Sequence, residues 1–400
     1  MKIAVYMSGY QPETGGGHTF EREVFEALLR RHNEYRHTFS VLSRSSSEAA
    51  LHQRLDGLPI SNHTVSVTAA EWLFQGVTRG MAQRHRFGSR ASGLDRAMKQ
   101  AGADLLWFVG QPASPQWTDY PYITTIWDVQ HRVTPWFPEL TSNGEWENRE
   151  WVNTSVLQRA TAVIIGTKTG QAEVERYYQV PPERILKLPH PTPQFALNAT
   201  GLPQDELPAS LELKEPYLLY PAQFWAHKNH ANILLALAEL RDRHGYAPQL
   251  ALVGADKGNK KHIAAMAEQL RLGDRVRFLG FVPQKDLITL YRRAAMLVYP
   301  SWFGPENLPP LEAFALGCPV IASRIPGAEE QLGDAAIYCD PSSPSDIAEK
   351  IADVQASAEL RASLVTAGHA RAKSWTADDY VGGVMAFADK LEPALRSWAR

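Results

Sequence analysis

The sequence predicts an α/β protein with two doubly wound parallel sheets, and three observations support this fold class. Short apolar, β-branched segments alternate with helical patterns over most of the chain. Within these segments the apolar residues are continuous rather than alternating, which is typical of strands buried on both faces of a parallel sheet. The chain has 400 residues, more than one compact core usually holds, so two domains are expected.

The first half is expected to supply one sheet with its helices. Its helical patterns include 20–31 and 169–178. Its strand candidates are 2–7, 39–43, 104–109, 122–126 and 162–166.

The second half repeats this alternation after a Pro-rich stretch at 189–216, which lacks strong periodicity and is interpreted as a linker. We place the first domain at 1–200 and the second at 211–375. Because ligands of such sheets bind beyond the carboxyl ends of the strands, a cleft between the two domains is the expected site. The strand candidates of the second half are 217–221, 249–253, 276–279, 296–299, 319–322 and 336–339.

Composition narrows the classes of function. The chain is 44% hydrophobic and 21% charged with a net charge of −2, which is ordinary for a globular protein and does not indicate nucleic-acid binding. Its two cysteines are too few for a disulfide framework or a zinc cluster. The first residues lack the apolar core of a signal peptide and no apolar run is long enough to span a bilayer, so a cytoplasmic location is expected.

One basic segment, at 74–90, contains Arg79, Arg84, Arg86 and Arg90. We interpret it in the first place as a solvated helix face. The alternative is a contact for an anionic acceptor or a lipid surface, which would bring the protein to the inner face of the membrane as a peripheral protein.

The turn after the first strand, "SGYQPETGGGHTFEREV" at 8–24, contains Gly15, Gly16 and Gly17 just before a helix. Glycine permits a tight turn and a close approach of the backbone to a ligand. The pattern is not GxGxxG, and no acidic residue occupies the ribose-binding position after a second strand. Both features disfavour a nicotinamide dinucleotide.

The stretch "YPAQFWAHKNH" at 220–230 follows the first strand of the second half. Gln223, Lys228 and Asn229 in this loop could hold a diphosphate through one ammonium group and a few neutral donors. A solvated loop lysine is the alternative interpretation.

The stretch "WFGPENLPPLEAFALGCPVIAS" at 302–323 predicts a loop followed by a helix that begins near Leu308. The N-terminus of that helix would present backbone amides and the positive end of the helix dipole to an anion such as a phosphate. Glu312 is expected in the first turns, where its carboxylate could accept two hydrogen bonds from a ribose diol. Capping of the helix dipole is the alternative role for Glu312.

The strand-end segment "TTIWDVQH" carries Asp128 and His131. Both are expected at the carboxyl end of a strand, facing the cleft. A structural role is the alternative for the histidine.

In these segments the chain resembles the retaining GT-B glycosyltransferases, specifically the large fourth sequence family of nucleotide-sugar-dependent enzymes that build bacterial polysaccharides. The resemblance covers nearly the whole chain and is most specific at 217–340, where "PAQFWAHKNH", "LALVGADKG", "FGPENLPPLEAFALGCPVIAS" and "PGAEEQLGDAAIYCDP" follow the family's order. In the first half, "PETGGGHTFEREV" and "TTIWDVQHRVTPWFPEL" resemble its acceptor-side motifs. The resemblance implies the GT-B fold, with two Rossmann-like domains facing a cleft and a C-terminal helix, here 376–400, crossing back to the first domain.

The resemblance also implies a set of phosphate-binding residues. Gly16 and Gly17 match the glycine loop that approaches the donor phosphates and the acceptor. Lys228 matches the lysine that neutralises the leaving diphosphate. Leu308 and Pro309 match the turn whose amides meet the phosphates.

Further residues match the nucleoside-binding positions of the family. Glu312 matches the second glutamate of the family's E-x7-E motif, which binds the ribose. Phe281 and Val282 match the turn whose main chain meets the nucleobase. Glu330 matches a glutamate in the family's "PE" turn and is given no role.

The chain departs from the family pattern near the transferred sugar. Gly304 stands where the family usually has the first glutamate of the motif, so Glu306 or Asn307 is expected to contact the sugar instead. Gln223 replaces the usual arginine partner of the lysine, which leaves one positive charge fewer on the leaving group.

A further departure lies in the first half. The family often has His-Asp at 127–128, whereas this chain has Trp127 before Asp128. His131 is then expected to take over the polar contact beside the reacting carbon.

The implied reaction transfers a sugar from a nucleoside diphosphate to an acceptor hydroxyl with retention of configuration. Lys228 and the helix near Pro309 would stabilise the charge that develops on the diphosphate, so neither a metal ion nor another cofactor is expected. Mannose from GDP-mannose is the first expectation for the donor, ahead of UDP-sugars and dTDP-rhamnose, and the acceptor is expected to be a glycan or a lipid-linked glycan. The alternatives are a solute-binding protein, which would need an export signal, an epimerase or phosphorylase of the same fold, and a catalytically silent relative.

Overall fold

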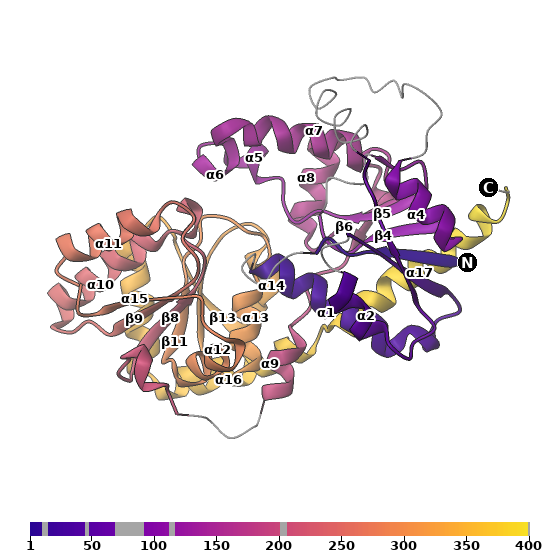
Figure 1. Cartoon of the computed structure of the whole chain (residues 1–400). Helices are drawn as coiled ribbons and strands as arrows, with labels where there is room; N and C mark the ends of the chain where they lie inside the picture. The colour runs from indigo at the N-terminus through magenta and orange to yellow at the C-terminus, as the bar shows by residue number, and fades with distance from the viewer. Residues whose placement is uncertain (10–14, 45–47, 69–91, 112–116, 201–205, 399–400) are drawn as a thin grey trace.

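The computed structural model describes residues 1–9, 15–44, 48–68, 92–111, 117–200 and 206–398. It contains two parallel sheets, one of seven strands and one of six. Figure 1 shows each sheet with its helices as a separate lobe, the first in indigo to magenta and the second in pink to orange. The predicted α/β class is therefore confirmed.

The sheet of the first lobe has the strand order β3-β2-β1-β4-β5-β6-β7. Buried residues fill both of its faces: α1 and α17 cover one face, and α4, α7 and α8 cover the other. Its strands are β1 (Lys2–Tyr6), β2 (Thr38–Ser43), β3 (Ser61–Thr64), β4 (Leu105–Phe108), β5 (Tyr122–Thr125), β6 (Ala162–Ile165) and β7 (Ile185–Lys187). Its helices are α1 (Gly16–Arg31), α2 (Glu48–Leu55), α4 (Gly93–Ala101), α5 (Gln130–Val133), α6 (Pro138–Thr141), α7 (Glu145–Leu157) and α8 (Lys168–Tyr178).

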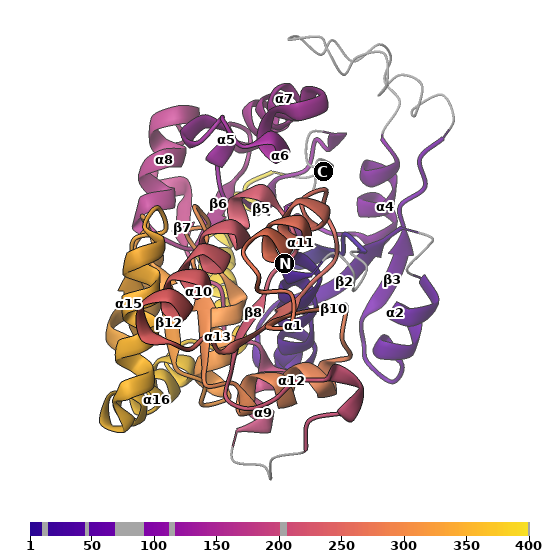
Figure 2. The same cartoon turned by 90° about the vertical axis from the view of Figure 1, so that its left-hand side faces the viewer.

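The sheet of the second lobe has the order β10-β9-β8-β11-β12-β13 and one continuous core. Figure 2 shows its helices on both sides of the strands. Its strands are β8 (Tyr217–Pro221), β9 (Gln249–Val253), β10 (Val276–Gly280), β11 (Met296–Tyr299), β12 (Val320–Ser323) and β13 (Ala336–Cys339). Its helices are α10 (His230–His244), α11 (Lys260–Gln269), α12 (Gln284–Arg293), α13 (Leu308–Ala315), α14 (Ala328–Leu332), α15 (Pro344–Ala356) and α16 (Ala358–Lys373).

The last helix, α17 (Ala377–Leu395), returns to the first lobe and packs against α1. Tyr380, Val381 and Val384 are buried in the first core. Arg30 of α1 also pairs with Asp378 at 2.7 Å. Figure 1 shows this helix in yellow against the indigo elements, as the resemblance implied for 376–400.

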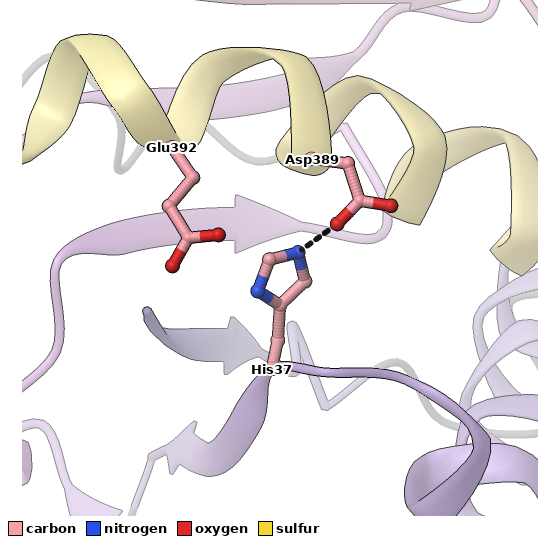
Figure 3. Close-up of side chains that lie close together, drawn as sticks. All are labelled: His37, Asp389 and Glu392. Carbon is pink, nitrogen blue, oxygen red and sulfur yellow. Dashed lines mark ion pairs between the residues drawn. The ribbon is translucent and has the colours of Figure 1, made fainter.

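Figure 3 shows a second attachment of α17, through His37, Asp389 and Glu392. Their ligand-type atoms lie within 4.8 Å of one another, and His37 Nε2 is 3.1 Å from Asp389 Oδ1. The guanidinium group of Arg36 pairs with both carboxylates, and the N-terminal ammonium group and Arg396 pair with Glu392, so their negative charge is balanced. We therefore interpret this cluster as an ionic contact between the residues just before β2 and the C-terminal helix.

Two strands of the first lobe and the α-helix in the linker were not predicted from the sequence. β3 (SNHT) and β7 (ILK) are the two edges of their sheet. An edge strand has a single neighbour and is partly exposed, so it lacks the continuous apolar run of a central strand. The Pro-rich stretch contains a short helix, α9 (Gln194–Ala199), because Ala196 and Ala199 are buried in the second core.

Candidate functional site

A cleft of about 570 Å³ lies between the two lobes. It is lined from the first lobe by the turn before α1 and by Trp127 and His190, and from the second lobe by the ends of β8, β9, β10 and β11. Of the predicted site residues, the following line it: Gly16, Gly17, Gln223, Lys228, Phe281, Val282, Glu306, Asn307, Leu308, Pro309 and Glu312. Asp128 and His131 are not among the lining residues.

Lys228 is half-buried, lines the cleft and lies two residues before α10. Its ammonium group donates to Tyr299 Oη at 3.0 Å and to Asn307 Oδ1 at 3.2 Å. Within the described part of the chain no carboxylate forms an ion pair with it, and burial lowers the pKa of Lys228 to about 8. A partly desolvated cation held only by neutral groups is a strong attractor for an anion.

The first turn of α13 lies beside this lysine. The side chain of Asn307 does not cap the helix, because its amide group donates to Gly304 O and its carbonyl oxygen accepts from Lys228. The first four backbone amides of a helix have no hydrogen-bond acceptor within the helix. The backbone amide of Asn307 donates to Gln331 Oε1, and Pro309 and Pro310 have no amide hydrogen to donate.

The amide of Leu308 is therefore the one donor that this first turn can offer to an anion. The sequence correctly predicted a helix from Leu308 with both prolines in its first turn. The prolines nevertheless remove two of the donors that made this turn attractive as a phosphate site. The electrostatic contribution of α13 thus comes from one amide and from the helix dipole.

Glu312 is buried one residue beyond the first turn of α13 and lines the same cleft. Its Oε2 accepts a hydrogen bond of 2.6 Å from the hydroxyl group of Tyr291. No cation pairs with it among the described residues, and burial raises its pKa to about 7. This geometry disfavours the alternative role of Glu312 as a cap of the helix dipole.

The loop between β10 and α12 carries the predicted nucleobase turn. Val282 is buried, whereas the side chain of Phe281 is 65% exposed. Both residues line the cleft. An exposed aromatic ring at a cleft mouth offers a flat apolar surface.

The glycine turn closes the cleft from the first lobe. A Cβ atom on Gly17 would lie 2.8 Å from the indole ring of Trp127, and one on Gly16 would be 3.9 Å from Leu308 of the other lobe. Glycine at 17 is therefore required by the close approach of Trp127. The α1 helix that begins here has no side-chain cap, and its first residues line the cleft, so its positive end also faces the cleft.

Gln223 reaches toward this turn from the second lobe. Its Nε2 lies 3.5 Å from the Cβ position of Gly15, and its Oε1 accepts a hydrogen bond of 3.0 Å from the indole of Trp225. A neutral amide thus occupies the place where the family resemblance implies an arginine.

Glu306 joins the two lobes. Its side chain is only 3% exposed, and its Oε1 accepts a hydrogen bond of 2.6 Å from the backbone amide of His190. Gly166, at the end of β6, makes room for it, because a Cβ atom there would lie 1.5 Å from Glu306 Oε2. Burial raises the pKa of Glu306.

The predicted placement of His131 is wrong. His131 lies in α5, is fully buried, and has Nε2 3.0 Å from both Glu150 Oε1 and Tyr178 Oη. Burial lowers its pKa to about 4, so it is neutral near pH 7. It therefore links α5 to α7 and α8 within the first lobe rather than facing the cleft.

Asp128 is partly exposed but also lies outside the cleft lining. Its Oδ1 accepts from the backbone amide of Gln130 at 2.9 Å and lies 3.7 Å from Arg149. It is nonetheless close enough to raise the pKa of Lys228 through its charge. Asp128 thus acts on the cleft through its field, without lining it.

Two further carboxylates bridge the lobes. Glu139 of α6 accepts from the backbone amide of His227 at 2.9 Å and from its Nδ1 at 2.5 Å. Glu330, for which the sequence indicated no role, accepts from the amides of Lys168 and Thr169 at the start of α8. Both carboxylates use backbone donors of the opposite lobe and so hold the cleft in this closed arrangement.

The cleft contains residues that the sequence did not indicate. His190, Trp127 and His227 line it, and the ring of His227 stacks on Phe303 at 4.0 Å. His190 stands between two prolines and His227 directly before Lys228. A single sequence does not distinguish such loop positions from solvated ones. Trp127 was noted only as a departure from the family pattern.

The basic segment with Arg79, Arg84 and Arg86 lies outside the described residues. Within the described ranges, no helix combines the length and the apolarity needed to cross a bilayer.

Comparison with known proteins gives a family match in the second half of the chain. Residues 204–371 match the family model for glycosyl transferases group 1. O-antigen chain mannosyltransferase B of Escherichia coli is 27% identical over 228 residues, which are 55% of this chain and 58% of that protein. The chain therefore matches less than two thirds of the length of that relative.

Solved structures resemble the whole chain. Sucrose-phosphate synthase from Thermosynechococcus elongatus superposes with a TM-score of 0.71 at 19% identity, covering 98% of this chain and 100% of that one. The Anabaena protein HepE in complex with UDP-glucose gives a TM-score of 0.67 at 17% identity, with coverage of 98% and 100%. These likenesses establish the fold, which is GT-B, as the sequence predicted.

Proposed function

We propose that this chain, whose residues 204–371 form a group 1 glycosyl transferase domain, transfers a sugar from a nucleoside diphosphate to a hydroxyl group of a glycan or glycolipid acceptor. The reaction would retain the anomeric configuration and belong to polysaccharide biosynthesis.

One observation carries this proposal: the half-buried Lys228 and the buried Glu312, of opposite charge, line one cleft without a counterion among the described residues. Lys228 is held by two neutral oxygen atoms and Glu312 by one phenol. Neither forms an ion pair within the described residues. A nucleoside diphosphate complements both, because its phosphates can neutralise the ammonium group and its ribose hydroxyls can donate to the carboxylate.

The proposed donor site distributes the nucleotide over the second lobe. Lys228, Gln223, Asn307 and the amide of Leu308 would hold the diphosphate, with the glycine turn at Gly16 and Gly17 closing over it. Glu312 would bind the ribose. Phe281 and Val282 would meet the base.

The chemistry follows from this placement. The bond between the anomeric carbon and the phosphate oxygen breaks, and a bond from that carbon to the acceptor oxygen forms. Lys228 and the positive end of α13 stabilise the charge that grows on the leaving diphosphate. That diphosphate takes the acceptor proton on the same face of the sugar, and the closed lobes exclude water that would hydrolyse the donor.

Fewer side chains are available to contact the transferred sugar, because Gly304 has none at the position where the family resemblance implies a glutamate. Asn307 faces the cleft beside Lys228, which supports a contact with the sugar. Glu306 lines the cleft but is engaged by His190, so its carboxylate is free for the sugar only if the two lobes separate. Asp128 would act by its negative field on the developing oxocarbenium ion.

GDP-mannose is the proposed donor, supported by family frequency and by the mannosyltransferase relative. UDP- and dTDP-sugars are the alternatives, and HepE with its bound UDP-glucose supports the first of them. The proposed acceptor is a growing glycan or a lipid-linked glycan, with no metal ion or other cofactor required.

A transfer assay tests the proposal. Purified protein is incubated with GDP-mannose, UDP-glucose or dTDP-rhamnose, a lipid-linked glycan preparation, and EDTA. We expect one donor to give a product heavier by one sugar residue, with the donor's anomeric configuration in its NMR coupling constants. An inverted product would contradict retention, and nucleotide binding without any transfer or hydrolysis would indicate a catalytically silent relative.

A further inference from the structure

The contact between Tyr291 and Glu312 joins two helices at the base of the cleft. Tyr291 lies in α12 and is fully buried, and its hydroxyl group donates to Glu312 Oε2 at 2.6 Å. Tyr299 lies nearby and binds Lys228. The carboxylate of Glu312 is thus fixed from one side by a phenol that cannot itself reach a ligand.

The second carboxylate oxygen of Glu312, Oε1, is not held in this way. Glu312 Oε1 has no hydrogen-bond partner in the described part of the chain, and it is not among the fully enclosed polar atoms that lack one. Since the residue lines the cleft, Oε1 is the oxygen left for a ligand. A ligand that satisfies it must donate, as hydroxyl groups do.

We infer that Tyr291 is a positioning residue for the nucleotide: by holding Oε2 it turns Oε1 of Glu312 toward the ribose hydroxyl groups of the donor. This inference rests on the proposed nucleotide-sugar function. A carboxylate that the rotatable bonds of the glutamate side chain would otherwise leave mobile is presented in one orientation, which lowers the entropy lost when the ribose binds.

The hydrogen bond also acts on the charge of Glu312. Burial without a cation favours the protonated acid, whereas a phenol that donates to the carboxylate favours the ionised form. The ionised form has two acceptor oxygens, so one can serve Tyr291 while the other accepts from the ribose. Tyr291 therefore shifts Glu312 toward the ionised form, which offers a diol a free acceptor oxygen.

The test compares ribose with 2′-deoxyribose, since a merely structural tyrosine would not change their ratio. Dissociation constants are measured by calorimetry for GDP, UDP and their 2′-deoxy forms. For the wild type we expect the deoxy form of the bound nucleotide to be weaker by roughly 10- to 100-fold, the loss of a hydrogen bond to a charged acceptor. In Tyr291→Phe we expect this ratio to fall to about 2, with the deoxy form binding as in the wild type.

A second variant makes the test independent of how well Tyr291→Phe folds. In Glu312→Ala the acceptor that Tyr291 holds is removed, so discrimination between ribose and 2′-deoxyribose should be lost. If discrimination persists in Glu312→Ala, the ribose is bound by another group that Tyr291 does not orient, which would overturn the inference.

The matched control is Tyr217→Phe. Tyr217 is equally buried, and its hydroxyl group donates to Leu290 O at 2.7 Å, next to Tyr291 in the sequence. This variant should keep the wild-type ratio. A wild type that discriminates, with Tyr291→Phe discriminating equally well, would overturn the inference alone, as would a wild type that binds both forms equally. A wild type that binds neither GDP nor UDP would instead contradict the nucleotide site on which it rests.

Discussion

The two walls of the cleft differ in the kind of group that they present. The second-lobe wall, which we define by Gln223, Lys228, Asn307 and Glu312, carries charges and amides held by neighbours within that lobe. The first-lobe wall, defined by Gly16, Gly17, Trp127 and His190, offers mainly backbone and ring surfaces, and its cation, Arg22, pairs with Glu23. The difference indicates that the second lobe is preorganised for a charged ligand, whereas the first lobe closes over it.

The hydrogen bonds between the two lobes support this distinction between the walls. Glu139, Glu306 and Glu330 each accept from a backbone amide of the opposite lobe. None of these contacts involves Lys228 or Glu312. Nucleotide affinity should therefore depend on the second-lobe wall, while stability of the closed arrangement depends on the contacts between the lobes.

The largest expected effect is that of Lys228→Ala, which removes the cation of the second-lobe wall. We expect kcat/KM for sugar transfer to fall by about 10³-fold, because the ammonium group binds the diphosphate and also stabilises the charge that develops on it. Steady-state kinetics with the active donor measure this.

Lys350→Ala is the control, since Lys350 pairs with Asp346 on α15 and lies outside the cleft. It should leave kcat/KM unchanged. A loss of less than about threefold in Lys228→Ala, under 1 kcal/mol, would show that the wall does not act through this charge.

A smaller effect is expected from pH. The pKa of Lys228 is about 8 in the unliganded protein, and the protonated form binds the diphosphate. As pH rises above 8 the free protein loses this proton, so the dissociation constant should rise by up to about tenfold per pH unit. Calorimetry from pH 7 upward measures this, and Lys228→Ala should lack the alkaline limb. A dissociation constant that stays level to about pH 9.5, more than one unit above that pKa, would exclude Lys228 as the phosphate-binding cation.

The smallest effect on nucleotide affinity is expected from Gly166→Ala, which changes only the contact between the lobes. The new methyl group would lie 1.5 Å from Glu306 Oε2, so Glu306 must move and release His190. Overpacking of this kind costs about 1–3 kcal/mol, seen as a lower midpoint of thermal unfolding.

The dissociation constant for the nucleoside diphosphate should nevertheless change by less than about threefold in Gly166→Ala. Gly382→Ala is the control, because a Cβ atom there meets nothing within 4 Å and alanine favours the helix. If Gly166→Ala weakened nucleotide binding as strongly as Lys228→Ala, the distinction between the two walls would be lost.

The sequence was sufficient to predict an element where a local residue pattern has one structural consequence. The central strands were predicted because continuous apolarity reports burial on both faces, and α13 was predicted to begin at Leu308 because prolines fit a first helical turn. The edge strands β3 and β7 were not, since partial exposure removes the apolar run.

The site was only partly predictable for a related reason. Lys228 and Glu312 were predicted as site residues from their motifs and their positions after strands. The partner of Glu312, in contrast, depends on how α12 packs against α13. The burial of His131 depends likewise on Glu150 and Tyr178, which lie 19 and 47 residues further along the chain. Such contacts are set by tertiary packing, which local patterns do not report.

The central claim is that the second-lobe wall binds a nucleoside diphosphate through Lys228. The most direct measurement is the thermal unfolding midpoint of the wild type and of Lys228→Ala with GDP, UDP, dTDP and ADP. One nucleotide at a hundred times its dissociation constant should stabilise the wild type by about 2.7 kcal/mol, raise its midpoint, and leave the variant nearly unchanged. If no nucleoside diphosphate raises the midpoint, or if the variant responds as the wild type does, the claim is wrong.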